Sequence, residues 1–254
     1  MDFNALHHQP QPLLIANVWD ACSALAAQQA GYHALGTSSA AIAAMLGYED
    51  GEAMSFDELL FIVTRIRAVT KLPLNVDLEA GYGKTTDDIV ENIHRLVPLG
   101  VVGINLEDSH VVNGVRQLDD ATVFASRVQE LGRACSGVFL NVRTDTFLLN
   151  VKDALKETLS RGRLYAEHGA NGFFVPGVTR PDDITAVARE VTLPLNVMCM
   201  PELEDFGTLA TLGVRRISMG NFAHAAIQTQ LKDLLCTVQR QQSFAEVFNH
   251  ENHR

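Results

Sequence analysis

Short apolar segments alternate with longer segments of helical periodicity eight times along the chain. The apolar segments are rich in Leu, Ile, Val and Phe, as in strands that are buried on both faces of a parallel sheet. We expect these strands at residues 13–17, 32–36, 74–79, 101–108, 138–143, 172–177, 193–197 and 214–218. This alternation indicates repeated strand–helix units.

Start and stop signals place helices between these strands. Asp20 opens an Ala-rich helix, and Ser55 with Glu58 three residues later is a capping box before an apolar run. Pro181 suits the first turn of a helix, and Gly169 is a usual residue after a helix end. Further helices are expected at about residues 86–100, 119–131, 151–168 and 222–240.

Eight such units in 254 residues predict a (β/α)8 barrel of the TIM type, in a single domain of residues 1–254. The alternative is a doubly wound open sheet, but no Gly-x-Gly-x-x-Gly follows the first strand. Residues 37–50 are expected to form a polar turn and a long connection.

Composition excludes several classes of partner. The net charge is −10, and Lys and Arg form no cluster, so we expect no nucleic-acid and no anionic-membrane partner. No apolar run reaches the length of a membrane span, and no signal region opens the chain. The four cysteines are scattered without a Cys-x-x-Cys, which predicts a reduced, cytoplasmic, soluble protein.

Asp77 and Glu79 are the first candidates for chemistry. They end the third predicted strand two residues apart, so their side chains share one face of the strand. Two like charges so close need a cation or a shared proton. Gly81 and Gly83 then let the chain turn tightly or let a ligand approach the backbone. We interpret this stretch as the floor of a divalent-metal site.

A barrel would gather the C-terminal ends of all its strands on one rim. The polar residues at those ends are Thr37, Ser38, Ser39, Asp77, Glu79, Glu107, Asp108, Arg143, Asp145 and Asn196. Carboxylates without a Cys/His set favour a hard cation, Mg²⁺ or Mn²⁺. Arg143 would clamp a carboxylate or phosphonate, and the turn at Ser38 and Ser39 would offer backbone N–H groups to an oxyanion.

The order of the motifs identifies a family resemblance over nearly the whole chain. These motifs are Asn17-Val18-Trp19-Asp20-Ala21, Thr37-Ser38-Ser39-Ala40, Gly47-Tyr48-x-Asp50, Asp77-x-Glu79-x-Gly81-Tyr82-Gly83, Glu107-Asp108 and Asn141-x-Arg143. The set resembles the isocitrate lyase/phosphoenolpyruvate mutase superfamily. The resemblance implies a (β/α)8 barrel, bound Mg²⁺, and a pyruvate-like enolate formed as a C–C or P–C bond breaks or forms.

The resemblance also implies roles for single residues. Asp77 matches the direct metal ligand, and the acids that hold the metal or its waters are matched by Asp50, Glu79 and Glu107. Ser38, Ser39 and Ala40 match the turn that binds the substrate carboxylate and oxyanion, and Arg143 matches the arginine that clamps substrate. From their places on the rim, Thr37 and Asn196 are also expected to bind substrate, and Ser39 and Arg143 are expected to be catalytic. Members often swap their last helix between subunits of a dimer or tetramer. The apolar positions of the last predicted helix, such as Leu231 and Leu235, fit such a homo-oligomer.

One departure from the superfamily bears on the reaction. Its lyases carry a Lys-Lys-Cys-Gly-His-type loop after the Glu-Asp pair, whereas residues 109–116 contain neither Cys nor Lys. A thiol-dependent lyase mechanism is therefore disfavoured. Decarboxylation of an oxaloacetate-like acid needs no base, while retro-aldol cleavage does, and His110 is the candidate base on this loop.

Three classes of function follow. The leading one is a Mg²⁺-dependent carbon–carbon lyase acting on a small 2-oxo or 2-hydroxy dicarboxylic acid, similar to oxaloacetate decarboxylase or an alkylmalate lyase. The second is a P–C bond enzyme, phosphonopyruvate hydrolase or phosphoenolpyruvate mutase. The third is a non-catalytic relative that binds a small carboxylate.

Overall fold

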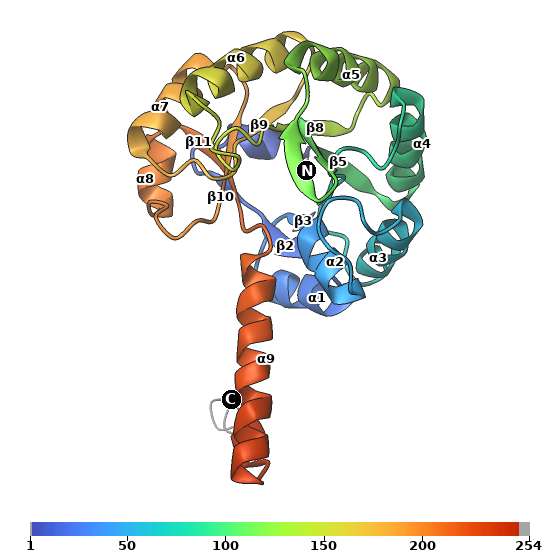
Figure 1. Cartoon of the computed structure of the whole chain (residues 1–254), viewed down its shortest axis with the longest axis vertical. Coiled ribbons are helices and arrows are strands. Elements are labelled where there is room, and N and C mark those ends of the chain that lie inside the picture. Colours follow the sequence, from blue (N-terminus) through green and yellow to red (C-terminus); the bar gives the residue numbers. More distant parts are fainter. Residues whose placement is uncertain (1, 249–254) are drawn as a thin grey trace.

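A computed structural model describes residues 2–248 and shows a ring of parallel strands inside a ring of helices (Figure 1). The ring is formed by β1 (Leu13–Leu14), β2 (Ala16–Val18), β3 (Leu35–Thr37), β4 (Leu74–Asp77), β5 (Val101–Glu107), β8 (Phe139–Arg143), β9 (Gly172–Phe174), β10 (Leu195–Met198) and β11 (Val214–Ser218). Every pairing within it is parallel. The predicted (β/α)8 barrel is confirmed.

The first predicted strand closes the ring in two pieces. β1 pairs with β11, and the following β2 pairs with β3. Between them, Ile15 donates its backbone N–H to the carbonyl of Ile217 at 2.9 Å. One continuous segment of chain therefore joins the first and last strands of the barrel.

The helices follow the strands with the caps that the sequence predicts. They are α1 (Ala21–Gln29), α2 (Ser39–Leu46), α3 (Phe56–Val69), α4 (Thr86–Leu96), α5 (Ala121–Ala134), α6 (Ala154–Glu167), α7 (Pro181–Glu190), α8 (Phe206–Thr211) and α9 (Phe222–Gln241), with 3₁₀ turns η1 (Ala5–His8) and η2 (Val97–Leu99). Asp20 caps α1, and Ser55 and Glu58 form the expected capping box at α3.

Two segments differ from the expectation. The connection after β3 contains α2, which Ser38 caps and Gly47 ends in the left-handed conformation. Its sequence is apolar on almost every side, so it has no amphipathic period to reveal it. After β5, an antiparallel hairpin of β6 (Ser109–Val112) and β7 (Val115–Leu118) replaces the expected loop.

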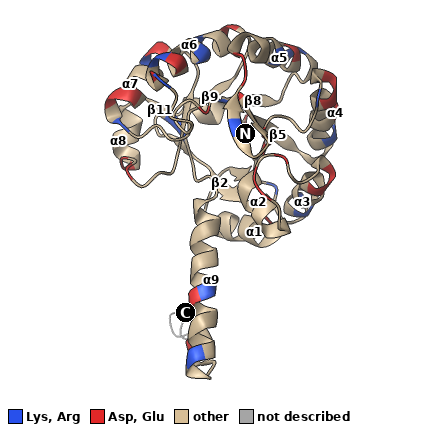
Figure 2. Cartoon of the chain, viewed as in Figure 1, with Lys and Arg blue, Asp and Glu red and all other residues tan. Residues whose placement is uncertain are grey.

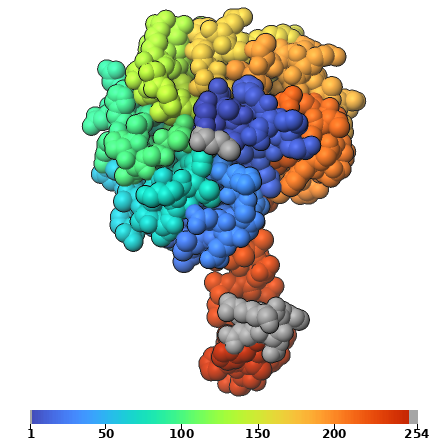
Figure 3. Space-filling model, turned by 180° about the vertical axis from the view of Figure 1, so that it is seen from behind, coloured from blue at the N-terminus to red at the C-terminus, as the bar shows by residue number. Residues whose placement is uncertain are grey.

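The barrel interior is polar in the middle and apolar at the N-terminal end. Phe3, Leu6, Ile15 and Phe139 belong to a buried cluster that closes this end. Figure 3 shows the N-terminal segment lying across the centre of the barrel from that side. The larger apolar core lies between the strands and the surrounding helices. The N-terminal end is thus sealed, and the C-terminal end is left for a site.

α9 stands apart from the barrel (Figure 1). His224 is its one buried residue among those described, while Ile227, Leu231 and Leu235 are about half exposed. In Figure 2 the outer helices of the barrel carry charges of both signs, whereas α9 carries few. No helix within residues 2–248 is long and apolar enough to cross a membrane.

Replacing each of two helical glycines with alanine should change the free energy of unfolding in opposite directions. A Cβ at Gly162 in α6 would lie 2.7 Å from both Phe173 and Val191, whereas at Gly132 in α5 no atom comes nearer than 3.8 Å. We expect Gly132→Ala to raise the free energy of unfolding by about 0.5–1 kcal/mol. Gly162→Ala should lower it by about 1–3 kcal/mol, because the core must shift. Denaturant titration of both variants checks this, and equal effects would contradict the packing.

Candidate active site

A small cavity of about 180 Å³ opens among the C-terminal ends of the strands. It is lined by Asn17, Ser38, Ser39, Ala40, Asp50, Asp77, Asn105, Arg143, Leu148, Phe174, Met198, Ser218, Gly220 and Asn221. Six of the predicted site residues, from Ser38 to Arg143, are therefore brought to one small space.

Asp77, the last residue of β4, is held from two sides. Its Oδ2 accepts hydrogen bonds from the Ser39 hydroxyl at 2.8 Å and from the Ser39 backbone N–H at 3.3 Å. Its Oδ1 accepts from the Asn105 amide at 3.3 Å. Thr37 Oγ1 accepts the backbone N–H of Asp77 at 2.7 Å, which fixes the strand end. The carboxylate is thus oriented while facing the cavity.

Glu79 lies beside this cavity and is almost fully buried. Its Oε1 accepts the Tyr82 hydroxyl at 2.5 Å, and its Oε2 accepts the backbone N–H of Glu52 at 2.8 Å. Its φ of 49° puts a non-glycine residue in the left-handed region, which is a local strain typical of functional sites. Burial raises the pKa of Glu79 to about 7, and the carboxylates of Asp50 and Asp77 add to this rise.

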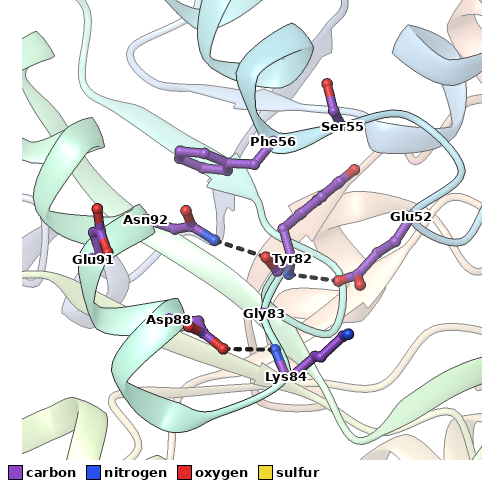
Figure 4. Close-up of a pocket in the computed structure, with 9 residues that line it drawn as sticks. All are labelled: Glu52, Ser55, Phe56, Tyr82, Gly83, Lys84, Asp88, Glu91 and Asn92. Carbon is purple, nitrogen blue, oxygen red and sulfur yellow. Dashed lines mark hydrogen bonds between the residues drawn. The ribbon is translucent and has the colours of Figure 1, made fainter.

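Figure 4 shows the open groove on the other side of Tyr82. Tyr82 donates its backbone N–H to Glu52 at 2.7 Å and accepts a hydrogen bond from Asn92 at 3.0 Å on its carbonyl. Lys84 and Asp88 line the same groove. This groove is separate from the cavity at Asp77, and Tyr82 and Glu52 contact Glu79 from the groove side.

Glu107, the last residue of β5, contacts two guanidinium groups. Arg143 Nη1 lies 2.8 Å from its Oε2, and Arg116 pairs with its Oε1. Burial raises the pKa of Glu107, and the two arginines oppose that rise. Arg143 also donates to both oxygens of Asp145, at 2.6 and 3.0 Å. Arg143 is therefore fixed in place before any substrate arrives.

Asp50 reaches the cavity from the connection after α2. Its side chain is about half exposed, and Arg116 Nη2 lies 3.2 Å from its Oδ2. Ser38 and Ala40 border the same space at the start of α2, where Ser38 Oγ accepts the backbone N–H of Ala41 at 3.3 Å. The N-terminus of α2 therefore faces the cavity with its partial positive charge.

Glu79, Glu107 and Asp145 lie beside the cavity without lining it, and four other predicted residues, Asn196, Thr37, Asp108 and His110, lie further from it. Asn196 lies deeper in the barrel, where it accepts from Asn141 at 3.0 Å. Thr37 is buried beneath Asp77. Asp108 faces outward from the barrel interior and pairs with Arg161 at 2.9 Å. His110 sits on β6, its Nδ1 2.5 Å from Asp119 and its side chain about half exposed.

Three residues of the site, Asn17, Asn105 and Arg116, were not among the predicted site residues. Asn17 lies where the first and last strands of the barrel meet. Its side chain donates to the Thr37 carbonyl at 3.0 Å and accepts the Met219 N–H at 2.7 Å. Asn105 precedes Glu107 by two residues and so shares its face of the strand, which is a signal that could have found it. Arg116 offers no such signal, since only the hairpin pairing brings it to the site.

The donor set suits a dication. Five carboxyl groups (Asp50, Asp77, Glu79, Glu107, Asp145) face three guanidinium groups (Arg116, Arg143, Arg216), so with every carboxyl ionised two negative charges are left over. Within the described residues, no three His, Cys, Asp or Glu side chains converge tightly enough to hold a metal by themselves. Glu107 Oε2 is nevertheless buried without a well-formed hydrogen bond. The residues therefore fit an ion bound by Asp77 and by waters on the other acids.

The sequence pattern of the phosphoenolpyruvate phosphomutase family matches residues 3–238. The chain belongs to this family. The predicted superfamily, whose members include carbon–carbon lyases and mutases, is thereby confirmed.

Three proteins illustrate the similarity. A protein from Burkholderia cenocepacia, provisionally named a phosphonomutase, has a solved structure with 39% identity and a TM-score of 0.86, covering 92% of this chain and 97% of that one. Oxaloacetate decarboxylase of Paraburkholderia xenovorans is 29% identical, over 87% of this chain and 74% of the relative. A phosphonopyruvate hydrolase solved with oxalate and Mg²⁺ shares the fold at 20% identity and a TM-score of 0.86, over 97% and 88% of the two chains.

The raised pKa of Glu79 predicts a pH-dependent stability. Between the ordinary value of 4.5 and about 7, the folded protein binds a proton that the unfolded chain releases. The free energy of unfolding should therefore fall as pH rises through this range. In EDTA, we expect the wild type to lose about 1 kcal/mol more than Glu79→Gln between pH 6 and pH 8. Parallel pH curves from denaturant titration would contradict the assignment.

Proposed function

We propose that the chain is a Mg²⁺-dependent carbon–carbon lyase that acts on a small 2-oxo dicarboxylic acid, as oxaloacetate decarboxylase does. The observation that carries the proposal is the juxtaposition of Asp77 and Arg143 in one cavity of about 180 Å³. A carboxylate that suits a hard cation thus shares a cavity with a guanidinium that suits an anionic substrate.

The metal would be held by Asp77, with Asp50, Glu79 and Glu107 on its waters. When bound, Mg²⁺ or Mn²⁺ would supply positive charge to a 2-oxo acid and so favour enolate formation. The solved phosphonopyruvate hydrolase with oxalate and Mg²⁺ has the same fold, which supports this choice of ion and ligand class.

The chain's own residues would bind and orient the substrate. Arg143 is held by Asp145 and Glu107, so its guanidinium needs little reorganisation to meet a substrate carboxylate. The N-terminus of α2, at Ser39 and Ala40, would receive an oxyanion. Leu148, Phe174 and Met198 form the apolar part of the wall, which would limit water around the substrate.

The lining favours decarboxylation over retro-aldol cleavage. Among the described residues that line the cavity there is no His, Cys or Lys. Retro-aldol cleavage requires a base for the hydroxyl proton, and His110 lies outside the lining, against Asp119. The two carboxylates in the lining, Asp50 and Asp77, are the ones proposed to hold the metal and its waters. In decarboxylation the C–C bond breaks, its electron pair stays on the pyruvate enolate, CO₂ leaves, and a proton from solvent completes pyruvate.

Replacing Asp77 tests the metal and the activity together. We expect Asp77→Asn to lower metal-dependent release of pyruvate from oxaloacetate by at least about 100-fold, because the direct ligand is lost. The matched control is Asp57→Asn, on the surface of α3, where Asp57 pairs with Arg95. The assay couples pyruvate to a dehydrogenase and subtracts the metal-only rate. Undiminished turnover by Asp77→Asn would refute the role of this carboxylate.

The second candidate is cleavage of a P–C bond. The family match, and the name of the Burkholderia cenocepacia relative, favour it. Phosphate released from phosphonopyruvate, with no pyruvate from oxaloacetate or alkylmalates, would select this candidate. Binding of oxalate with Mg²⁺ but no turnover of any of these acids would select a non-catalytic carboxylate-binding relative.

We also propose that the protein is a homo-oligomer, a dimer or tetramer, in which α9 packs against another subunit. Ile227, Leu231 and Leu235 lie four residues apart along an exposed side of the helix. A helix that exposes such a stripe gains from burying it in a partner. An apolar groove at the base of α9 includes Leu203 and Phe206, which suits a helix from a second copy.

Charges placed on this stripe should separate the subunits. We expect the double variant Leu231→Glu, Leu235→Glu to elute as a monomer in size-exclusion chromatography with light scattering, because each Glu would have to be buried in the interface. The control carries Gln228→Glu and Gln230→Glu, two exposed positions beside the stripe, which add the same negative charge. A monomeric wild type would rule out the proposal.

A further inference from the structure

Arg116 is an arginine at the candidate site that the proposed function does not use. It comes from β7, and the hairpin brings its guanidinium over the acids. Nη1 pairs with Glu107 and lies 3.1 Å from Ser109 Oγ and 3.5 Å from Asp145. Nη2 lies 3.2 Å from Asp50 Oδ2. One guanidinium thus bridges acids from two strand ends and from the connection after α2.

The hairpin is fastened to this connection by packing as well as by charge. A Cβ on Gly51 would come within 2.5 Å of Val111, so the two segments are in close contact beside Asp50. The Arg116 side chain is largely covered, with 17% of its surface exposed. It does not line the cavity. Arg116 can therefore act on the site through the carboxylates that it holds and through its charge, but not by contact with a ligand in the cavity.

We propose that Arg116 is a positioning residue that acts as a built-in cation and competes with a divalent metal ion for Asp50 and Glu107. The inference rests on the proposed function, because the dication belongs to it. Each oxygen that accepts from Arg116 would be unavailable to the waters of an ion held by Asp77. The guanidinium charge would also repel a dication bound beside the same acids.

This competition sets two properties at once. The arginine lowers the affinity for the dication, so that the metal binds more tightly once the charge is removed. Binding of the dication in turn weakens the contacts of Arg116 with Asp50 and Glu107, which loosens the hairpin. A purely structural arginine would have the opposite effect, because its loss would disorder the acids and weaken metal binding.

Isothermal titration calorimetry with Mn²⁺, with and without oxalate, tests the proposal. We expect Arg116→Gln to bind Mn²⁺ roughly tenfold more tightly than the wild type, since one unit charge is removed beside the ion. Arg116→Lys keeps the charge and should stay within about threefold of the wild type. Arg163→Gln removes the same charge on the outer surface, where Arg163 pairs with Glu190, and should change nothing.

The outcomes separate this inference from the proposed function. Equal or weaker Mn²⁺ binding by Arg116→Gln overturns the inference and leaves the proposed function standing. No Mn²⁺ uptake by the wild type and by every variant, even with oxalate, overturns both.

Should Arg116→Gln fail to fold, hydrogen exchange on the wild type answers the same question. The backbone amides of residues 109–118 should exchange several-fold faster at saturating Mn²⁺ than in EDTA. Unchanged or slower exchange there would overturn the inference.

Discussion

Five carboxyl groups gathered at one end of a barrel repel one another, and the candidate site depends on how this charge is balanced. The protein places guanidinium groups on three sides of the cluster. Arg143 holds Glu107 and Asp145, Arg116 bridges Glu107 and Asp50, and Arg216 is buried in the barrel below Asp77. Two negative charges remain, and burial alone makes them costly. A dication relieves that cost, and so does a proton such as the one that Glu79 keeps up to about pH 7. Metal binding and stability are therefore linked.

The rim is supported by a layer of asparagines one step deeper in the barrel. Asn75, Asn105, Asn141 and Asn196 hydrogen-bond in sequence at 2.8–3.0 Å, and Arg216 contacts the first two at 3.3 Å. Each asparagine lies two residues before a cavity or rim residue on the same strand, as Asn75 does before Asp77. Because residues i and i+2 share a strand face, the asparagine layer fixes the strand ends that carry the rim.

This spacing explains what the sequence could and could not predict. Asp77 and Arg143 were predictable because each ends an apolar strand, and in a barrel such ends meet. Asn196 was expected on the rim, yet it is the second residue of β10, and Met198 occupies the rim instead. The apolar run of a short strand indicates that a strand is present, but it does not indicate which residue ends the strand. Asn196 was therefore assigned to the rim although it lies two residues before it.

Contacts between segments distant in sequence were beyond a pattern-based prediction. Arg116 meets Asp50 across 66 positions, through a hairpin whose two strands carry no clear alternation. α2 was hidden because its buried and cavity-facing sides are both small and apolar. The position of Arg116 and the presence of α2 are decided by packing between distant segments. Such packing leaves no periodic pattern in a single sequence.

The hairpin also bears on the type of reaction. The hairpin, residues 109–118, contacts the acids through Arg116. It contributes no side chain to the lining of the cavity. The lining then consists of amides, hydroxyls, one guanidinium, two carboxylates and apolar side chains. Such a lining can bind an anion and stabilise developing negative charge, but it offers no neutral base. The proposed decarboxylation, in which CO₂ departs without deprotonation, places no demand on such a base.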